Sequence, residues 1–273
     1  MGKKLGKFRT LNQHFPDNRG ILSMTAHYDR IAHLYVKTQD LPYRPHIEEY
    51  TYLQIIGDVA GLSVLDLACG DGLYTRQFKE KGASRVVGVD ISPKMIELAR
   101  EQENEHPLGI EYIVKDALEL GKIGEFDRVV SSYLLSYAQT RSQLLQMSWQ
   151  IFLNLKPGGC FLSINTDYQF PHAESSRLKK YGIAFKLPAS IQEGDAIAFT
   201  LKTVGDRQDV KFNNYYFDRT TYEEVFQEVG FSEIHWHQVI VSPEGIKEKG
   251  QEFWQDFLDH PIFVGIECLK PRE

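Results

Sequence analysis

Three aspartates at the ends of predicted strands are the residues whose types and spacing indicate chemistry most clearly. Asp66 lies in the apolar run at 63–68, Asp90 follows Gly70 by twenty residues, and Asp116 follows a third apolar run. A carboxylate at the position of Asp90 can accept hydrogen bonds from both hydroxyls of a ribose. Asp116 can accept one from the exocyclic amine of adenine. Because open α/β sheets bind ligands at the carboxyl ends of their strands, these acids predict a nucleoside site at one sheet edge.

The turn after the first of these strands points to the same edge. Residues 68–72 read A-C-G-D-G, and glycines allow the backbone to approach a ligand at the start of a helix. A dinucleotide site needs a third glycine, where this chain has Thr75. The turn therefore predicts a ligand without a pyrophosphate. The spacing of Asp90 nevertheless keeps an NAD(P)-dependent oxidoreductase open as an alternative.

Alternating strands and helices are the elements that must position these residues. Strands are predicted at 63–68, 85–91, 110–115, 126–132 and 160–165, with helices between them. This alternation is typical of an α/β fold: a Rossmann-like, doubly wound and mostly parallel sheet with right-handed crossovers.

The last third of the chain departs from this alternation. Two segments rich in β-formers, at 196–204 and 209–217, flank Gly205-Asp206 and predict an antiparallel hairpin. Late strands near 232–241 and 262–269 give the predicted seven-stranded sheet an antiparallel end. The hairpin belongs to an inserted lid at about 167–217.

Helix starts are marked by capping signals at three places. Ser92 precedes Pro93, which suits an N-cap followed by proline at the first helical position. Thr140-x-x-Gln143 and Thr220-x-x-Glu223 have the capping-box spacing. An earlier helix is expected to begin near Thr25.

The first 23 residues differ in composition from the rest of the chain. They carry five Lys or Arg and one Asp and lack a periodic apolar face. We expect residues 1–23 to be a disordered extension and residues 24–273 to form one domain. Whether translation starts at Met1 or Met24 stays open.

Composition excludes several classes of protein. The chain has 37 acidic and 31 basic residues, a net charge of −6, which disfavours a partner bound through its phosphate backbone. No apolar run approaches the length that spans a bilayer. Cys69, Cys160 and Cys268 lack the spacing of a metal site and suit a reducing compartment. We therefore expect a cytoplasmic protein without metal, nucleic acid or membrane partner.

Five segments, in this order, resemble the class I S-adenosylmethionine (SAM) dependent methyltransferases. They are residues 64–75, 86–92, 116–117, 126–137 and 155–159. The resemblance implies SAM as cofactor and S-adenosylhomocysteine as product, with the turn at 68–72 along the methionine part. The residues that we expect at the cofactor are Tyr28, Arg44, Asp66, Ala68, Cys69, Gly70, Gly72, Tyr74, Asp90, Ile91, Met95, Asp116, Ala117, Ser132 and Tyr133.

Individual roles follow from this resemblance and from side-chain chemistry. Asp90 would hold the ribose, Ile91 and Met95 would pack on adenine, and Asp116-Ala117 would contact its edge. Ser132 and Tyr133 would lie under the sulfonium. Arg44 suits a carboxylate because a guanidinium binds one bidentately.

A closer resemblance, over residues 28–32, 167–170 and 250–258, is to the small-molecule N-methyltransferases of toxoflavin biosynthesis. It implies a methyl acceptor that is small and planar. We expect the aromatic residues Tyr168, Phe170 and Tyr181 to contact this acceptor. Tyr28 and Asp167 are the candidate catalytic residues, and the protein is expected to be a monomer or homodimer. A SAM-binding module without turnover is the other alternative.

Overall fold

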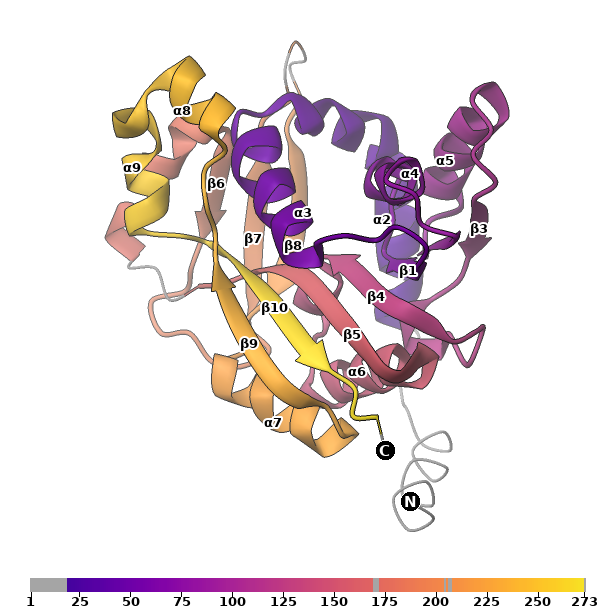
Figure 1. The fold of residues 1–273 in the computed structure, drawn as a ribbon. Coiled ribbons are helices and arrows are strands. Elements are labelled where there is room, and N and C mark those ends of the chain that lie inside the picture. Colours follow the sequence, from indigo (N-terminus) through magenta and orange to yellow (C-terminus); the bar gives the residue numbers. More distant parts are fainter. Residues whose placement is uncertain (1–18, 169–171, 204, 206–207, 273) are drawn as a thin grey trace.

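The computed structural model describes residues 19–168, 172–203, 205 and 208–272. Its centre is a seven-stranded sheet in the order β3-β2-β1-β4-β5-β10-β9 (Figure 1). Strands β1 to β5 are parallel, and β10 is antiparallel to both of its neighbours. The predicted Rossmann-like sheet with an antiparallel end is confirmed. The strands are β1 (Ser63–Leu67), β2 (Arg85–Asp90), β3 (Glu111–Val114), β4 (Phe126–Ser132), β5 (Leu155–Thr166), β9 (Ser232–Gln238) and β10 (Phe263–Leu269).

Alternation of apolar residues gives the sheet two buried faces. Val64, Val86 and Val130 point into a core that includes residues of α3 (Tyr50–Ile56), α4 (Leu73–Glu80) and α5 (Pro93–Glu105). Leu65 and Val87, one residue further along, point into a second core with α6 (Arg141–Asn154) and α7 (Arg219–Val229). Because both faces are covered, the central strands are apolar throughout, as the sequence shows.

Two of the three predicted helix starts are confirmed. The side chains of Ser92 and Thr140 accept hydrogen bonds from the backbone N–H groups of Met95 and Gln143, at 3.2 Å each. At α7 the N-cap is Asp218 rather than Thr220, and its carboxylate accepts from the Thr220 N–H. The predicted start was two residues late. The Thr220-x-x-Glu223 spacing suggested Thr220 as the cap, but Asp218 is an equally suitable N-cap residue.

The insertion forms a three-stranded sheet instead of a hairpin. Strands β6 (Ile183–Lys186), β7 (Ala196–Leu201) and β8 (Val210–Tyr215) pair antiparallel in that order. Strand β6 was not predicted from the sequence; its four residues follow the short helix η5 (His172–Tyr181). The rings of Phe185 and Phe199 stack with centroids 5.9 Å apart, which joins β6 to β7.

The N-terminal helices lie across the carboxyl ends of the parallel strands (Figure 1). Helix α2 (Arg19–Val36) begins six residues before the predicted start near Thr25, so 19–23 are helical and 1–18 fall outside the described residues. The short helices η1 (Lys37–Asp40) and η2 (Arg44–Glu49) follow, and η2 has π-helical geometry and leads directly into α3.

Four further short helices complete the described elements. Helices η3 (Ala117–Glu119) and η4 (Leu134–Tyr137) follow β3 and β4, and α8 (Pro243–Lys249) and α9 (Gln251–Asp259) lie between β9 and β10. None of the described helices has both the length and the apolar character needed to cross a membrane.

Candidate active site

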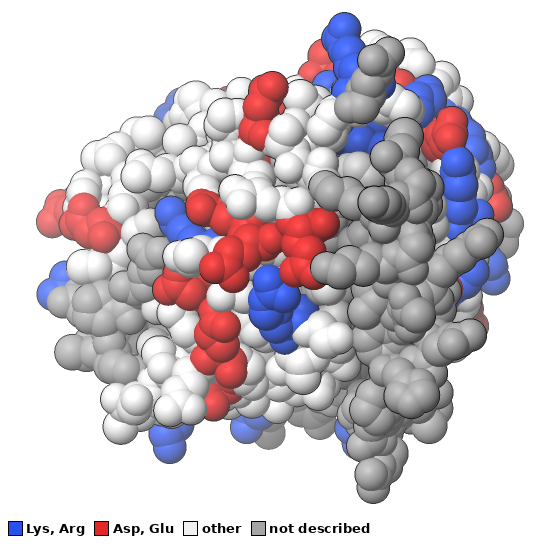
Figure 2. Space-filling model, turned by 90° about the horizontal axis from the view of Figure 1, so that it is seen from below, with Lys and Arg blue, Asp and Glu red and all other residues white. Residues whose placement is uncertain are grey.

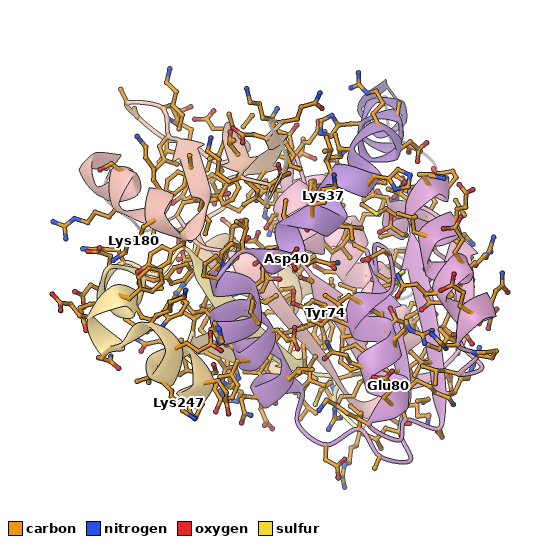
Figure 3. All side chains as sticks on the ribbon, turned by 90° about the horizontal axis from the view of Figure 1, so that it is seen from above. Lys37, Asp40, Tyr74, Glu80, Lys180 and Lys247 are labelled. Atoms are coloured by element: carbon orange, nitrogen blue, oxygen red, sulfur yellow. The ribbon has the colours of Figure 1, made fainter. Side chains whose placement is uncertain are left out.

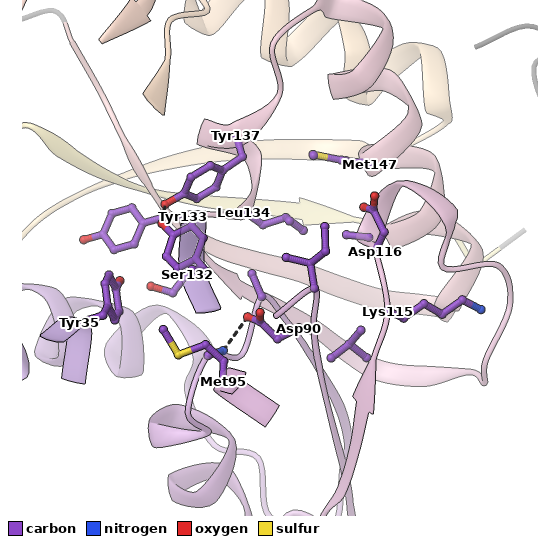
Figure 4. A pocket seen from close by; sticks show the side chains of 16 residues that line it. Tyr35, Asp90, Met95, Lys115, Asp116, Ser132, Tyr133, Leu134, Tyr137 and Met147 are labelled. Carbon is purple, nitrogen blue, oxygen red and sulfur yellow. Dashed lines mark hydrogen bonds between the residues drawn. The ribbon is translucent and has the colours of Figure 1, made fainter. Parts of the chain in front are cut away.

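A pocket lies at the carboxyl ends of β1, β2 and β4, beneath α2 (Figure 4). With its open mouth it holds about 770 Å³ of space free of protein atoms. We call it the main pocket. Its lining residues are Tyr28, Tyr35, Ala68, Gly70, Val89, Asp90, Ile91, Met95, Lys115, Asp116, Ala117, Ser132, Tyr133, Leu134, Tyr137 and Met147.

Asp90 stands at the middle of the main pocket (Figure 4). Its two carboxylate oxygens accept hydrogen bonds from the backbone N–H groups of Gly70, at 2.9 Å, and Ser92, at 2.8 Å. Burial raises the pKa of Asp90 to about 6, against the lowering effect of these backbone donors. Each oxygen has a second lone pair, so the carboxylate retains the capacity to bind a diol.

One end of the main pocket is apolar, with a carboxylate at its rim. Met147 lines this end, and Figure 4 shows it on the same side of Asp90 as Asp116, whereas Met95 lies on the side of Tyr35. Asp116 also caps η3, because its Oδ1 accepts from the Leu118 N–H at 2.8 Å. Burial raises the pKa of Asp116. This end offers a flat heterocycle an apolar surface and one hydrogen-bond acceptor.

The opposite end of the main pocket is aromatic. Tyr28, Tyr35, Tyr133 and Tyr137 line it, and the hydroxyls of Tyr28 and Tyr137 are hydrogen-bonded to each other. The ring of Tyr28 meets those of Tyr35 and Tyr137 edge-on, with centroids 6.1 and 5.8 Å away. Burial raises the pKa of Tyr28, Tyr133 and Tyr137, so these hydroxyls stay neutral near pH 7. Electron-rich ring faces suit a cation.

A smaller pocket adjoins the main one and shares Tyr35, Ala68, Gly70 and Ser132 with it. Figure 3 shows this side of the molecule, with η1, marked by Lys37 and Asp40, near Tyr74 of α4. The predicted residues that line this adjoining pocket without lining the main one are Arg44, Cys69 and Tyr74.

A buried carboxylate organises the wall of the adjoining pocket. Glu48, which is fully buried, accepts hydrogen bonds from the Arg44 guanidinium at 2.6 Å and from the hydroxyl of Tyr74 at 2.9 Å. Its other oxygen accepts from the hydroxyl of Tyr133, a wall of the main pocket. Arg44 also donates to the Tyr35 hydroxyl at 3.3 Å. Glu48 therefore connects η2 to both pockets.

Three of the predicted cofactor residues contact other residues of the protein, and two of them line neither pocket. Arg44 is paired with Glu48 rather than unpaired beside a ligand carboxylate. Asp66 lines neither pocket; it is buried inside β1 and accepts a hydrogen bond from Thr75 at 2.6 Å. Gly72 also lines neither pocket, and a Cβ on it would lie 2.5 Å from the Tyr112 hydroxyl.

The residues predicted to contact the acceptor are not at the main pocket. Tyr181 is fully buried, stacks on Trp254 and donates to the Phe253 carbonyl, so it belongs to a core. Tyr168 is also buried, with its ring edge-on to Phe185. Phe170 lies outside the described residues.

The candidate catalytic residue Asp167 also lies elsewhere. It forms a 2.5 Å ion pair with Arg219 and lines a separate pocket beside Trp236. Tyr28, the other candidate, does line the main pocket.

Several lining residues were missed from the sequence. Tyr35 follows Tyr28 by seven residues, two turns of one helix, so the spacing could have assigned it to the same face. Tyr137 is four residues after Tyr133, and it lines the pocket from the end of η4. No local signal marks Glu48, whose partners come from three separate segments.

The fold and pocket define a Rossmann-like protein that binds a nucleoside ligand at the ends of its strands. Residues 64–159 match the family model described as a methyltransferase domain. Two curated relatives are similar over about two thirds of the chain. N-demethylindolmycin N-methyltransferase of Streptomyces griseus is 30% identical over 174 residues, 63% of this chain and 70% of the relative. Demethylmenaquinone methyltransferase of Lactococcus lactis subsp. lactis (strain IL1403) is 31% identical over 190 residues, which cover 67% of this chain and 71% of the relative.

The chain belongs to the class I SAM-dependent methyltransferases, and SAM is its cofactor. A solved structure described as the DhpI-SAH complex has the same fold, with a TM-score of 0.61 at 18% identity, over 94% of this chain and 100% of that one. These findings exclude the alternative of an NAD(P)-dependent oxidoreductase.

The residues of the main pocket fit this cofactor. Asp90 suits a ribose diol, and the end of the pocket with Met147 and Asp116 suits an adenine ring. The neutral tyrosines at the other end suit a sulfonium, because a ring face attracts a cation. The backbone at Ala68 and Gly70 has φ of +57°, which exposes the turn along the pocket wall.

Proposed function

We propose that the protein transfers the methyl group of SAM to a nitrogen or oxygen atom of a small, planar molecule. The observation that carries this proposal is the aromatic end of the main pocket, where four tyrosines surround the position opposite the apolar end. Flat faces of such rings bind planar molecules by stacking. The two curated relatives are named for methylation of N-demethylindolmycin and demethylmenaquinone, both small molecules. Similarity to the enzymes of toxoflavin biosynthesis supports the same class of acceptor.

SAM supplies an electrophilic methyl group on a cationic sulfonium. In the proposed reaction a lone pair on the acceptor forms a bond to the methyl carbon while the carbon–sulfur bond breaks. The electron pair goes to sulfur, and the acceptor N–H or O–H loses its proton to solvent. Because the donor is already activated, positioning by the pocket supplies much of the rate enhancement.

We assign the protein's own residues to binding and positioning. Asp90 would hold the ribose, Asp116 the adenine edge, and Met147 an adenine face. Tyr28 and Tyr137 would close the reacting end and exclude water from it. We assign no general base at the main pocket, because an acceptor that is acidic or already ionised needs none.

The charge of the visible surface favours a small acceptor over a nucleic acid. On the face that carries α6 and α7, acidic side chains gather around few basic ones (Figure 2). Arg141 of α6 is paired there with Glu224 and Glu228 of α7. A surface for a phosphate backbone would need unpaired basic residues along one face.

Labelled SAM tests the proposal directly. The protein is incubated with methyl-labelled SAM and separate pools of tRNA, protein and small-molecule extract. The proposal expects label chiefly in the small-molecule pool. Label chiefly in tRNA or protein would contradict the acceptor class, and absence of label from every pool would favour the SAM-binding module without turnover.

A further inference from the structure

A second pocket lies on the other side of the Tyr28–Tyr137 pair. Both tyrosines line it as well as the main pocket, so the hydrogen-bonded pair lies where the two pockets meet. The remaining walls come from α2, from Gln139 after η4, and from β7 and β8 of the small sheet. We call it the α2–β8 pocket. With its open mouth it holds about 950 Å³ of space free of protein atoms.

The charge of the α2–β8 pocket is opposite to that of the whole chain. Arg30 and Lys211 line it, together with His27, and none of its described lining residues is an Asp or Glu. The chain as a whole has a net charge of −6. Within the described residues, no ion pair joins Arg30 or Lys211 to a carboxylate. Two cations that have no carboxylate partner among the described residues therefore line one cavity.

The walls of the α2–β8 pocket combine these cations with aromatic rings. Phe199 and Phe212 line it from neighbouring strands, stacked with centroids 5.4 Å apart, and Tyr215 follows on β8. The imidazole of His27 contacts the Lys211 carbonyl at 2.7 Å, which ties α2 to β8 beside the pocket. This contact places the segments that carry Arg30 and Lys211 on either side of the same pocket.

We infer that the α2–β8 pocket binds the methyl acceptor, and that this acceptor is a planar small molecule carrying a carboxylate or a phosphate. This inference rests on the proposed function. Arg30 and Lys211 would bind the anionic group, and the rings of Tyr28, Tyr137 and Phe212 would border the planar part. The reacting atom would then lie at the Tyr28–Tyr137 pair, which is the boundary with the main pocket. The neutral tyrosine hydroxyls can donate a hydrogen bond to an acceptor oxygen or nitrogen.

Charge gives this arrangement a physical reason. The donor is a cation and the proposed acceptor an anion, so the two attract each other across the tyrosine pair. The attraction is strengthened where protein excludes water from the path between them. Transfer of the methyl group then removes the positive charge from sulfur and leaves a neutral product, S-adenosylhomocysteine, in the main pocket.

Calorimetric binding of three matched probes tests the inference without turnover. The probes are 2-naphthoate, 2-naphthyl phosphate and the neutral 2-naphthamide, each titrated into the full chain saturated with S-adenosylhomocysteine. We expect at least one anion to bind more tightly than the amide, by about threefold or more, because Arg30 and Lys211 are exposed and two exposed charge pairs together have an effect of about this size. Preference for only one of the anions identifies the charged group of the acceptor.

Variants locate the preference at the predicted cations. The double variant Arg30→Gln and Lys211→Gln should lose the preference for the anion and keep its affinity for S-adenosylhomocysteine. Lys186→Gln is the matched control, since Lys186 is exposed on the same small sheet and does not line the pocket. It should bind all three probes like the unchanged protein.

The outcomes separate the two proposals. Three outcomes overturn the inference, provided that S-adenosylhomocysteine still binds. The preference for an anion over the amide is below threefold, no probe binds, or the preference persists in the double variant. The proposed function then stands, and is tested by the labelling experiment. If S-adenosylhomocysteine itself does not bind the unchanged protein, the proposed function fails first.

Discussion

The carboxylate of Asp90 accepts a hydrogen bond from the backbone N–H of Gly70 at 2.9 Å. This bond joins the end of β2 to the glycine turn after β1, so two walls of the main pocket are held by one side chain. The second oxygen of Asp90 fixes the start of α5 through Ser92. Asp90 therefore shapes the site before any ligand arrives, and binding adds partners to an oriented carboxylate.

Cofactor affinity should depend on pH through Asp90. Burial raises the pKa of this carboxyl to about 6 in the free protein. The ionised form accepts the ribose hydrogen bonds, so affinity for S-adenosylhomocysteine should be constant above pH 7 and fall as pH drops through 6. Well below that value the fall approaches about tenfold per pH unit. Calorimetry between pH 5 and 8 checks this, and affinity that rises toward low pH would contradict it.

Asp66→Asn should stabilise the protein at pH 8. Burial raises the pKa of Asp66 from 3.8 to about 7, so the folded state carries an unfavourable ionised carboxylate above that value. The contribution of Asp66 to the free energy of unfolding is largest below pH 4 and decreases as the pH rises toward 7. Asparagine can still accept the hydrogen bond of Thr75. We expect the variant's melting temperature to rise by at least about 3 °C at pH 8, with the gain shrinking toward pH 4.

Calorimetric scanning at both pH values measures this effect. Since Asp66 lines neither pocket, affinity for S-adenosylhomocysteine at pH 8 should change by less than about threefold, the effect of roughly 0.6 kcal/mol. A lower melting temperature at pH 8, or a large loss of affinity, would show that the carboxylate itself is required.

The Arg44–Glu48 pair should behave as one unit in stability. The two side chains are 10% and 0% exposed, so removing either partner leaves the other buried without its counter-charge. Arg44→Met and Glu48→Leu should each lower the free energy of unfolding by about 3–5 kcal/mol. The double variant should lose much less than the sum of the two. Urea unfolding of all four proteins measures the coupling, and additive losses would mean that the pair does not interact.

Two glycines of the turn should respond differently to alanine. Gly72 has φ of +84°, and its new Cβ would lie 2.5 Å from the Tyr112 hydroxyl, so Gly72→Ala should lower the melting temperature. Gly70 has φ of +57° and open space around the added methyl, which points to a smaller loss. Gly70 lines both the main and the adjoining pocket, so Gly70→Ala should chiefly weaken cofactor binding. Thermal unfolding and calorimetry together check this contrast, and equal effects on both measurements would contradict it.

The sequence predicted the parallel sheet because its signals are local. The apolar runs, the glycine turn and the caps at Ser92 and Thr140 each act within a few residues, and the structure confirms them. The main pocket includes nine of the predicted cofactor residues besides Tyr28: Ala68, Gly70, Asp90, Ile91, Met95, Asp116, Ala117, Ser132 and Tyr133. The spacing of strand ends indicated Asp90, Asp116 and the glycine turn, and the resemblance to class I methyltransferases implied the others.

Features that depend on distant partners were not predicted. Arg44 is paired with Glu48, and Glu48 in turn contacts Tyr133, 85 residues away along the chain. Tyr181 looks like an acceptor contact in the sequence, yet it packs on Trp254 of α9. An aromatic residue in an insertion can face a core or a pocket, and composition does not distinguish the two.

Calorimetric titration of S-adenosylhomocysteine into the unchanged protein and into Asp90→Ala tests the central claim most directly. Asp40→Ala is the control, because Asp40 is exposed on η1 and lines neither the main nor the adjoining pocket. The unchanged protein and Asp40→Ala should bind one equivalent with equal affinity, and Asp90→Ala should bind at least about tenfold more weakly, since each lost charge-assisted hydrogen bond costs roughly 1.5–3 kcal/mol. Equal affinity of a folded Asp90→Ala, or no binding by the unchanged protein, would contradict the assignment of the main pocket to SAM.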